Sequence, residues 1–259
     1  MCRFLAYLGP PLDLHALLFA PEHSLVRQSY APRHQRHGRV NADGFGVGWY
    51  DHSVRPEPGR YRSDRPIWSD RSLASMAGLV RSGAVVAAVR DATPPSLVEE
   101  SGSPPFACGR WLFAHNGAVA GFADGVGEAL RRRLSARCLA EIEGSADSEV
   151  VFALVLDALH QGATPETALS RVVAEVAAAA PCRLNLVLTD GTALAATAWG
   201  DTLFTLDGAG MAGDGVVVAS EPSDDDPAWR PVPEASVVTV DADGVRVAPL
   251  RPPATRVVP

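Results

Sequence analysis

The sequence contains no lysine, so all 23 of its basic residues are arginines. Without a lysine amine, Schiff-base chemistry and a Ser-Lys catalytic pair are excluded. No apolar run reaches about 18 residues, the length that a membrane-spanning helix needs, and no apolar segment of a secretory signal follows Met1. We therefore expect a cytoplasmic protein without a membrane-embedded part.

The cysteines are also few and widely spaced. Cys2, Cys108, Cys138 and Cys182 form no Cys-x-x-Cys pair, which is the spacing typical of structural zinc sites. We therefore expect neither a metal nor a cofactor. In a reducing compartment the thiols stay free, and the last three are most simply interpreted as small core or surface residues.

Acidic residues outnumber basic ones in this sequence. The formal net charge of the 259 residues is −7, which disfavours nucleic acid or an anionic membrane as a partner. With 47% hydrophobic and 20% charged residues, the composition is that of a globular protein. A small-molecule substrate is the partner that these properties favour.

The hydrophobic pattern predicts strands at both ends of the chain and helices between and around them. This order favours a single α+β domain over residues 2–250, built as two sheets with helices outside them, followed by a disordered tail at 251–259. The pattern predicts strands over 2–8, 84–90, 111–114 and 216–220, hairpins turning at Asp190-Gly191 and Asp243-Gly244, and helices over 13–19, 122–143, 147–160 and 165–180.

The second residue is a cysteine, and its position matters more than any internal motif. A small residue after Met1 permits removal of the initiator methionine. Cys2 would then carry a nucleophilic thiol and a free α-amine, whose ordinary pKa is about 8. One residue can thus supply both nucleophile and base, although a small second residue is common in proteins without any such role.

Three further signals lie where strands or helices are expected to end. The Asn116 side chain and the Gly117 N–H, in the run His115-Asn116-Gly117, can form an oxyanion hole; an ordinary turn is the competing interpretation. Arg90 can bind a carboxylate through two hydrogen bonds, or it can be a structural arginine paired within the protein. Asp147 can receive an ammonium group or cap a helix. Together with a cysteine nucleophile, these groups describe attack on a γ-glutamyl amide.

The residues that carry these signals resemble the class II glutamine amidotransferase domain. The resemblance rests on Met-Cys-Arg at the start, NADGFGVGW at 41–49, VRDAT at 89–93, HNG at 115–117 and SADSE at 145–149, in family order. It implies an N-terminal-nucleophile hydrolase fold, a four-layer αββα sandwich.

By this resemblance, Cys2 is the nucleophile and its α-amine the base, and Asn116 and Gly117 form the oxyanion hole. Arg90 and Asp147 hold the glutamyl carboxylate and ammonium. The resemblance further assigns Thr93, His115, Asp43 and Gly44 to the lining of the substrate site.

One departure from the family pattern matters. Biosynthetic amidotransferases carry a second domain that receives ammonia, whereas here only strands and a short tail follow the hydrolase region. A free-standing γ-glutamyl hydrolase is therefore expected. A glutaminase subunit that feeds ammonia to a separate partner remains an alternative, as does a non-catalytic binding module that has kept the fold.

Two segments resemble one subfamily, the amidohydrolases of the ergothioneine pathway. These are Gln28–Arg33 with His37-Gly38, and Ser220–Trp229. The resemblance implies removal of glutamate from γ-glutamyl-hercynylcysteine S-oxide. The trimethylammonium group of that substrate suits an aromatic face and carboxylates, which Trp229 beside Asp224–Asp226, or else Trp68, can offer. A solvated acidic loop is the competing interpretation of the aspartates.

Overall fold

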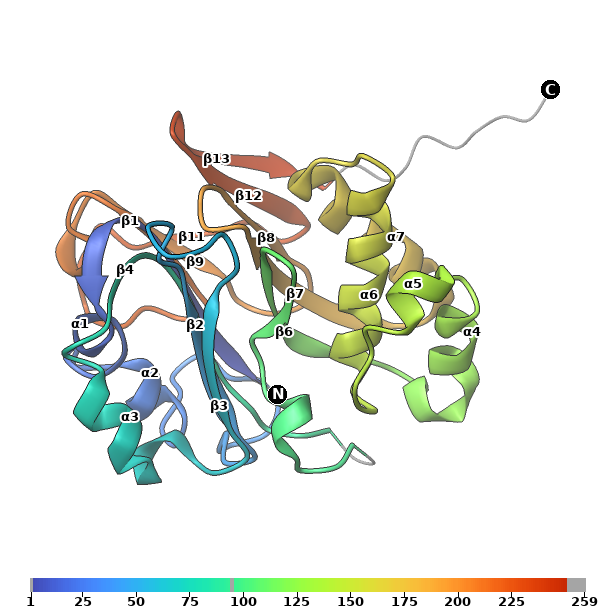
Figure 1. Cartoon of the computed structure of the whole chain (residues 1–259), viewed down its shortest axis with the longest axis horizontal. Coiled ribbons are helices and arrows are strands. Elements are labelled where there is room, and N and C mark those ends of the chain that lie inside the picture. The colour runs from blue at the N-terminus through green and yellow to red at the C-terminus, as the bar shows by residue number, and fades with distance from the viewer. Residues whose placement is uncertain (1, 94–95, 251–259) are drawn as a thin grey trace.

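The computed structural model describes residues 2–93 and 96–250. Two antiparallel sheets lie face to face, with α1 to α3 on one outer side and α4 to α7 on the other (Figure 1). The expected αββα sandwich is confirmed. The tail at 251–259 lies outside the described residues, so the expectation of disorder there stays a prediction.

The sheets are described in spatial order within these residues. The first has seven strands: β11 (Arg230–Pro231), β9 (Phe204–Asp207), β10 (Val216–Ala219), β1 (Arg3–Asp13), β4 (Arg81–Val89), β2 (Phe45–Trp49) and β3 (Gly59–Ser63). The second has six: β13 (Gly244–Pro249), β12 (Ser236–Asp241), β8 (Leu194–Ala198), β7 (Cys182–Thr189), β6 (Trp111–Val119) and β5 (Phe106–Cys108). The N-terminal strand β1 is therefore central in its sheet.

The helices of the two outer layers differ in length. The first layer holds the short α1 (Leu14–Leu18), α2 (Leu25–Gln28) and α3 (Arg71–Met76), and the second holds α4 (Gly127–Arg131), α5 (Ala136–Leu139), α6 (Asp147–His160) and α7 (Pro165–Ala179). Single turns of other helix types span Ile67–Ser69, Glu100–Gly102, Phe122–Val126 and Gly210–Ala212. In the described part of the chain, no helix is long and apolar enough to cross a membrane.

Three hydrophobic clusters fill the three interfaces between the four layers. Strand β1 shows how one strand serves two of them: Phe4 and Ala6 belong to the cluster between the sheets, whereas Leu5 and Tyr7 belong to the cluster beneath the first helical layer. Because successive side chains of a strand point to opposite faces, a strand buried on both faces is a near-continuous apolar run.

Two expectations from the sequence are wrong. The helix expected over 122–143 is broken into three short pieces, because Gly125 adopts φ 111° and Ser135 caps a new helix, α5, through its side chain. The run His115-Asn116-Gly117 lies inside β6 rather than at its end. The expected helices at 147–160 and 165–180 and both hairpins are confirmed, with boundaries that agree to within a few residues.

Candidate active site

Cys2 lies directly before β1, in the middle of the seven-stranded sheet. The register pairs Arg3 with Val89, so the chain leaves β4 at Arg90 beside the thiol. By the alternation along β1, Cys2 faces the layer between the two sheets, as Phe4 and Ala6 do. The residue is half-buried.

Burial and neighbouring groups shift the pKa of the Cys2 thiol in opposite directions. Burial raises the pKa of the Cys2 thiol above its ordinary value, and the charge of Asp147 acts in the same direction. A backbone hydrogen bond involving Asp91 and the charge of Arg90 act to lower it. The fold therefore brings Cys2, Arg90 and Asp147 within electrostatic reach of one another, and the thiol needs a base before it can attack.

Arg90 is 5% exposed and braces the loops around it. Its guanidinium donates to the carbonyl oxygens of Leu97 (3.0 Å) and Asp43 (3.5 Å), and its main chain bonds both Asp43 and Gly44. The Asp43 carboxylate accepts the Ala92 N–H at 2.9 Å. Since a guanidinium has five N–H donors, Arg90 keeps donors for a ligand, while Asp43 and Gly44 hold it in place.

Asn116 is completely buried, and neither its side-chain nitrogen nor its oxygen has a hydrogen-bond partner in the described residues. It faces the same inter-sheet layer as Leu112 and Ala114. Its cross-strand neighbour Asn185 contrasts with it, because that amide donates to the carbonyls of residues 201 and 202 and accepts the N–H of residue 199. A buried amide without partners is costly, which points to a group kept ready for a ligand.

Gly117 and His115 point the other way from β6. A Cβ at Gly117 would overlap the carbonyl of Arg183, so no other residue fits there without movement. The His115 ring lies 2.9 Å from the Ser148 hydroxyl through Nδ1 and 3.0 Å from the Arg183 carbonyl through Nε2. Both ring nitrogens are thus occupied within the protein, and His115 connects β6 to the start of α6.

Asp147 opens α6 and lines a surface pocket with Thr93. Its Oδ2 accepts the Val119 N–H at 3.0 Å. Asp147 does not cap the helix: the Glu149 carboxylate accepts the N–H groups of residues 143, 144 and 146 at the helix start. The N-cap position belongs to Ala146, and Asp147 is a first-turn anion of α6, with oxygen lone pairs left for a ligand.

The aromatic residues expected to flank the leaving group lie on the other side of β1. Trp229 is 8% exposed, and its indole N–H donates to Asp224 at 2.7 Å. It lines a surface pocket with Arg33, His34, Pro222 and Asp224–Asp226. Trp68 is 43% exposed and stands edge to face against Tyr30, with ring centroids 5.7 Å apart.

A buried carboxylate that sequence reasoning missed connects these segments. Glu221 accepts the N–H groups of Arg33 and His34 and lies 3.0 Å from Nε2 of His23. Burial acts to raise the pKa of Glu221, but the hydrogen bonds from His23 and His34 hold it below its ordinary value. In the sequence, Glu221 was marked solely by its place in the Ser220–Trp229 motif. Its partners Arg33 and His23 are 188 and 198 positions away, so no local pattern could reveal these contacts.

Comparisons with known proteins show which proteins this chain is similar to. The γ-glutamyl-hercynylcysteine sulfoxide hydrolase of Mycolicibacterium smegmatis is 44% identical over 256 residues, 96% of this chain and 100% of that protein. The structure of a glutamine aminotransferase class-II domain protein from Silicibacter pomeroyi superposes with a TM-score of 0.73 at 29% identity, covering 98% of this chain and 100% of that one.

The fold is shared more widely. The glutamine phosphoribosylpyrophosphate amidotransferase of B. subtilis superposes with a TM-score of 0.64 at 17% identity, covering 97% of this chain and 49% of that one. The model of the family described as class II glutamine amidotransferases matches residues 16–209. The chain thus belongs to the class II glutamine amidotransferase family.

Proposed function

We propose that the protein is a γ-glutamyl amidohydrolase that converts γ-glutamyl-hercynylcysteine S-oxide to glutamate and hercynylcysteine S-oxide. The observation that carries this proposal is the meeting of Cys2, Arg90 and Asp147 at one end of β1 and β4. The 44% identical relative, matched along its whole length, bears the name of this reaction.

Recognition of the glutamyl head falls to Arg90 and Asp147. The guanidinium pairs with the α-carboxylate, and the Asp147 carboxylate accepts hydrogen bonds from the α-ammonium. Thr93 lines the same pocket as Asp147 and offers a hydroxyl to either group. Asp43, Gly44 and His115 act indirectly, since they hold the main chain and side chains that touch the substrate.

The reaction begins once Met1 has been removed. The free α-amine of Cys2 takes the thiol proton, and the thiolate attacks the γ-carbonyl carbon. The resulting oxyanion accepts hydrogen bonds from the Asn116 side chain and the Gly117 N–H. Collapse of this intermediate breaks the C–N bond, and the α-ammonium of Cys2 protonates the leaving amine.

The second half of the reaction returns the enzyme to its starting state. The glutamyl group is now held on Cys2 as a thioester. The α-amine deprotonates a water molecule, which attacks the thioester carbonyl, and the same oxyanion donors stabilise the second intermediate. Glutamate leaves, and the thiolate recovers its proton.

The leaving group carries a trimethylammonium, which we assign to the pocket beside Trp229. Asp224 and Asp226 supply negative charge there, whereas Asp225 is paired with Arg33 at 2.9 Å. The exposed pair of Tyr30 and Trp68 is the second aromatic surface for such a cation. Replacing Trp229 by Leu should raise the KM for the conjugate and leave the hydrolysis of a simple γ-glutamyl amide unchanged.

The decisive experiment compares two substrates on the same preparation. Intact mass first establishes the loss of Met1, and the protein is then incubated with γ-glutamyl-hercynylcysteine S-oxide and, separately, with free glutamine. Rapid release of glutamate from the conjugate with slow release of ammonia from glutamine supports the proposal. Brisk ammonia release with an uncleaved conjugate would instead indicate a glutaminase subunit, and inactivity of the Met1-free protein toward both substrates would indicate a binding module.

A further inference from the structure

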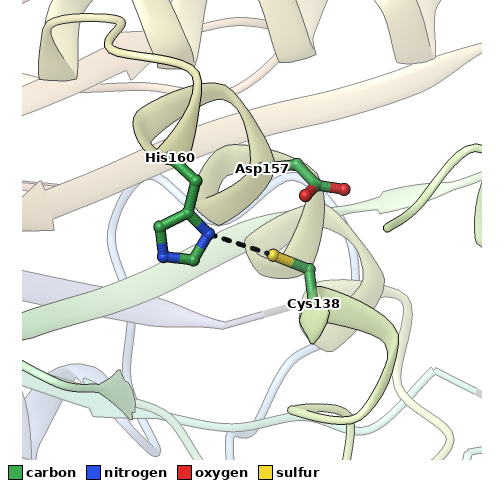
Figure 2. Close-up of side chains that lie close together, drawn as sticks. All are labelled: Cys138, Asp157 and His160. Carbon is green, nitrogen blue, oxygen red and sulfur yellow. Dashed lines mark hydrogen bonds between the residues drawn. The ribbon is translucent and has the colours of Figure 1, made fainter. Parts of the chain in front are cut away.

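Three side chains with metal-binding atoms meet where α5 packs against α6. Figure 2 shows Cys138, Asp157 and His160 turned toward one another. One ligand atom of each lies within 4.8 Å of the other two, and Cys138 Sγ is 3.4 Å from His160 Nδ1. Tetrahedral zinc sites with bonds of about 2.0–2.3 Å place neighbouring ligand atoms about 3.5 Å apart, so small movements suffice to close the set around one ion.

The helices hold the three groups in this arrangement. Asp157 and His160 are three residues apart on α6 and therefore share a face, and Cys138 lies on α5. The Asp157 carboxylate accepts hydrogen bonds from the Ser135 hydroxyl at 2.5 Å and the Ser135 N–H at 2.8 Å. Such partners behind a ligand fix its orientation and support metal affinity.

The three side chains differ in solvent exposure, which leaves a path for a metal ion to enter. Cys138 is buried against the hydrophobic core, Asp157 is half-buried, and His160 is exposed. An ion can thus arrive from solvent by way of the imidazole, and one coordination position stays open to water. Three protein ligands with water in the fourth position is the arrangement of zinc sites that keep one position open.

We propose that Cys138, Asp157 and His160 bind one Zn²⁺ ion, with water as the fourth ligand. A thiolate, an imidazole and a carboxylate together suit this borderline-soft ion better than Mg²⁺ or Ca²⁺, which prefer oxygen ligands alone. When the sulfur–zinc bond forms, the Cys138 thiol releases its proton to solvent. The neutral His160 ring donates its Nδ1 lone pair.

The site ties α5 to α6 and takes no part in the hydrolysis. His160 lies thirteen residues along α6 from Asp147, about 20 Å at the rise of an α-helix. The zinc proposal therefore does not depend on the proposed function, and either can fail without the other. We expect zinc to stabilise the second helical layer and to leave turnover unchanged.

The test uses the full-length protein after treatment with a chelator. Equilibrium dialysis followed by metal analysis should give one Zn²⁺ per chain, and saturation should raise Tm by about 5 °C or more. Co²⁺ is the spectroscopic probe, because a thiolate ligand gives a near-ultraviolet charge-transfer band and a tetrahedral site gives intense visible bands. Failure to bind either ion overturns the proposal.

Four variants locate the ion. Cys138→Ser and His160→Gln should each abolish the cobalt charge-transfer band and the rise in Tm, whereas Cys2→Ala and His52→Gln, which change a thiol and an exposed imidazole elsewhere, should keep both. Because His160 is exposed, His160→Gln should fold even if Cys138→Ser does not. A band that survives His160→Gln, or that disappears in Cys2→Ala, would show that the metal binds elsewhere.

Discussion

Cys2 and Cys138 are two thiols of one chain in opposite surroundings. Burial raises the pKa of both, so thiol acidity does not distinguish them. Cys2 faces the layer between the sheets, within electrostatic reach of Arg90 and Asp147. Cys138 lies on α5 where it meets α6, with the His160 Nδ1 atom 3.4 Å from its sulfur and an Asp157 oxygen within 4.8 Å.

The difference shows that the neighbours of a thiol, rather than its burial, set its chemistry. Around Cys2, the charges of Arg90 and Asp147 act on the sulfur from neighbouring elements, and nearby charges of this kind can tune a thiol for covalent catalysis. Around Cys138 the ligand atoms are close enough to share one ion with the sulfur. Four predictions test this contrast.

The largest effect is expected at the proposed nucleophile. Cys2→Ala should lower kcat for the γ-glutamyl conjugate by at least about 10⁴-fold, since no other group in the site can form the thioester. Calorimetry should still detect binding, because Arg90 and Asp147 remain. The control, Cys182→Ser, changes another half-buried thiol and should keep full turnover. An active Cys2→Ala protein would disprove the mechanism.

The paired amides Asn116 and Asn185 allow a matched test. Asn116→Ala should lower kcat by about 10²–10³-fold, as expected for one oxyanion donor, without lowering Tm, because it removes an unsatisfied buried group. Asn185→Ala removes four internal hydrogen bonds and should destabilise the protein by about 2–4 kcal/mol. Thermal unfolding and steady-state kinetics on both variants check this pair, and a clear loss of Tm in Asn116→Ala would contradict the assignment.

A smaller loss is expected at the ammonium subsite. Asp147→Asn should reduce kcat/KM by about 10–100-fold, mostly through KM, because one charge-assisted hydrogen bond is worth about 1.5–3 kcal/mol. Glu128→Gln, which removes an exposed carboxylate paired with Arg132, serves as the control and should change neither constant. If kcat/KM is unchanged in Asp147→Asn, the substrate ammonium is bound by other residues and this assignment is wrong.

The smallest effect separates the two thiols by their rate of alkylation. Cys2 lies half-buried beside its site and Cys138 is fully buried, so iodoacetamide should label Cys2 several-fold faster. Because burial raises the pKa of the Cys2 thiol, its labelling should speed up as pH rises through the alkaline range, where the thiolate forms. Peptide mass spectrometry follows both sites, and equal rates would contradict the difference in exposure.

Much of the fold and of the proposed catalytic site could be predicted from the sequence. The near-continuous apolar run 84–90 predicts a strand covered on both sides, and the order of strands and helices favours two sheets with helices outside them. Cys2 beside a removable Met1 indicated the proposed role, because nucleophile and base would then belong to one residue. The same local logic identified Arg90 and Asp147 as charges at element boundaries.

Other features depend on which distant segments meet, and a sequence pattern of period two or 3.6 carries no such information. Asn116 and Asn185 are both strand asparagines, and their different hydrogen bonding follows only from what lies across the sheet. Glu221 meets His23 across 198 positions. Gly125 and Ser135 interrupt a pattern that otherwise continues as helix, because backbone conformation and capping outweigh apolar periodicity there.

The absence of a Cys-x-x-Cys pair argued against one kind of zinc site, and from it we expected no metal. It could not address ligands that come from two helices, because Cys138 and His160 are 22 positions apart and the intervening chain must turn back on itself before they meet. Local order therefore specified most of the elements and indicated the proposed nucleophile. Long-range packing brought the partners of each thiol together, since contact between elements is set by the shape of the whole core.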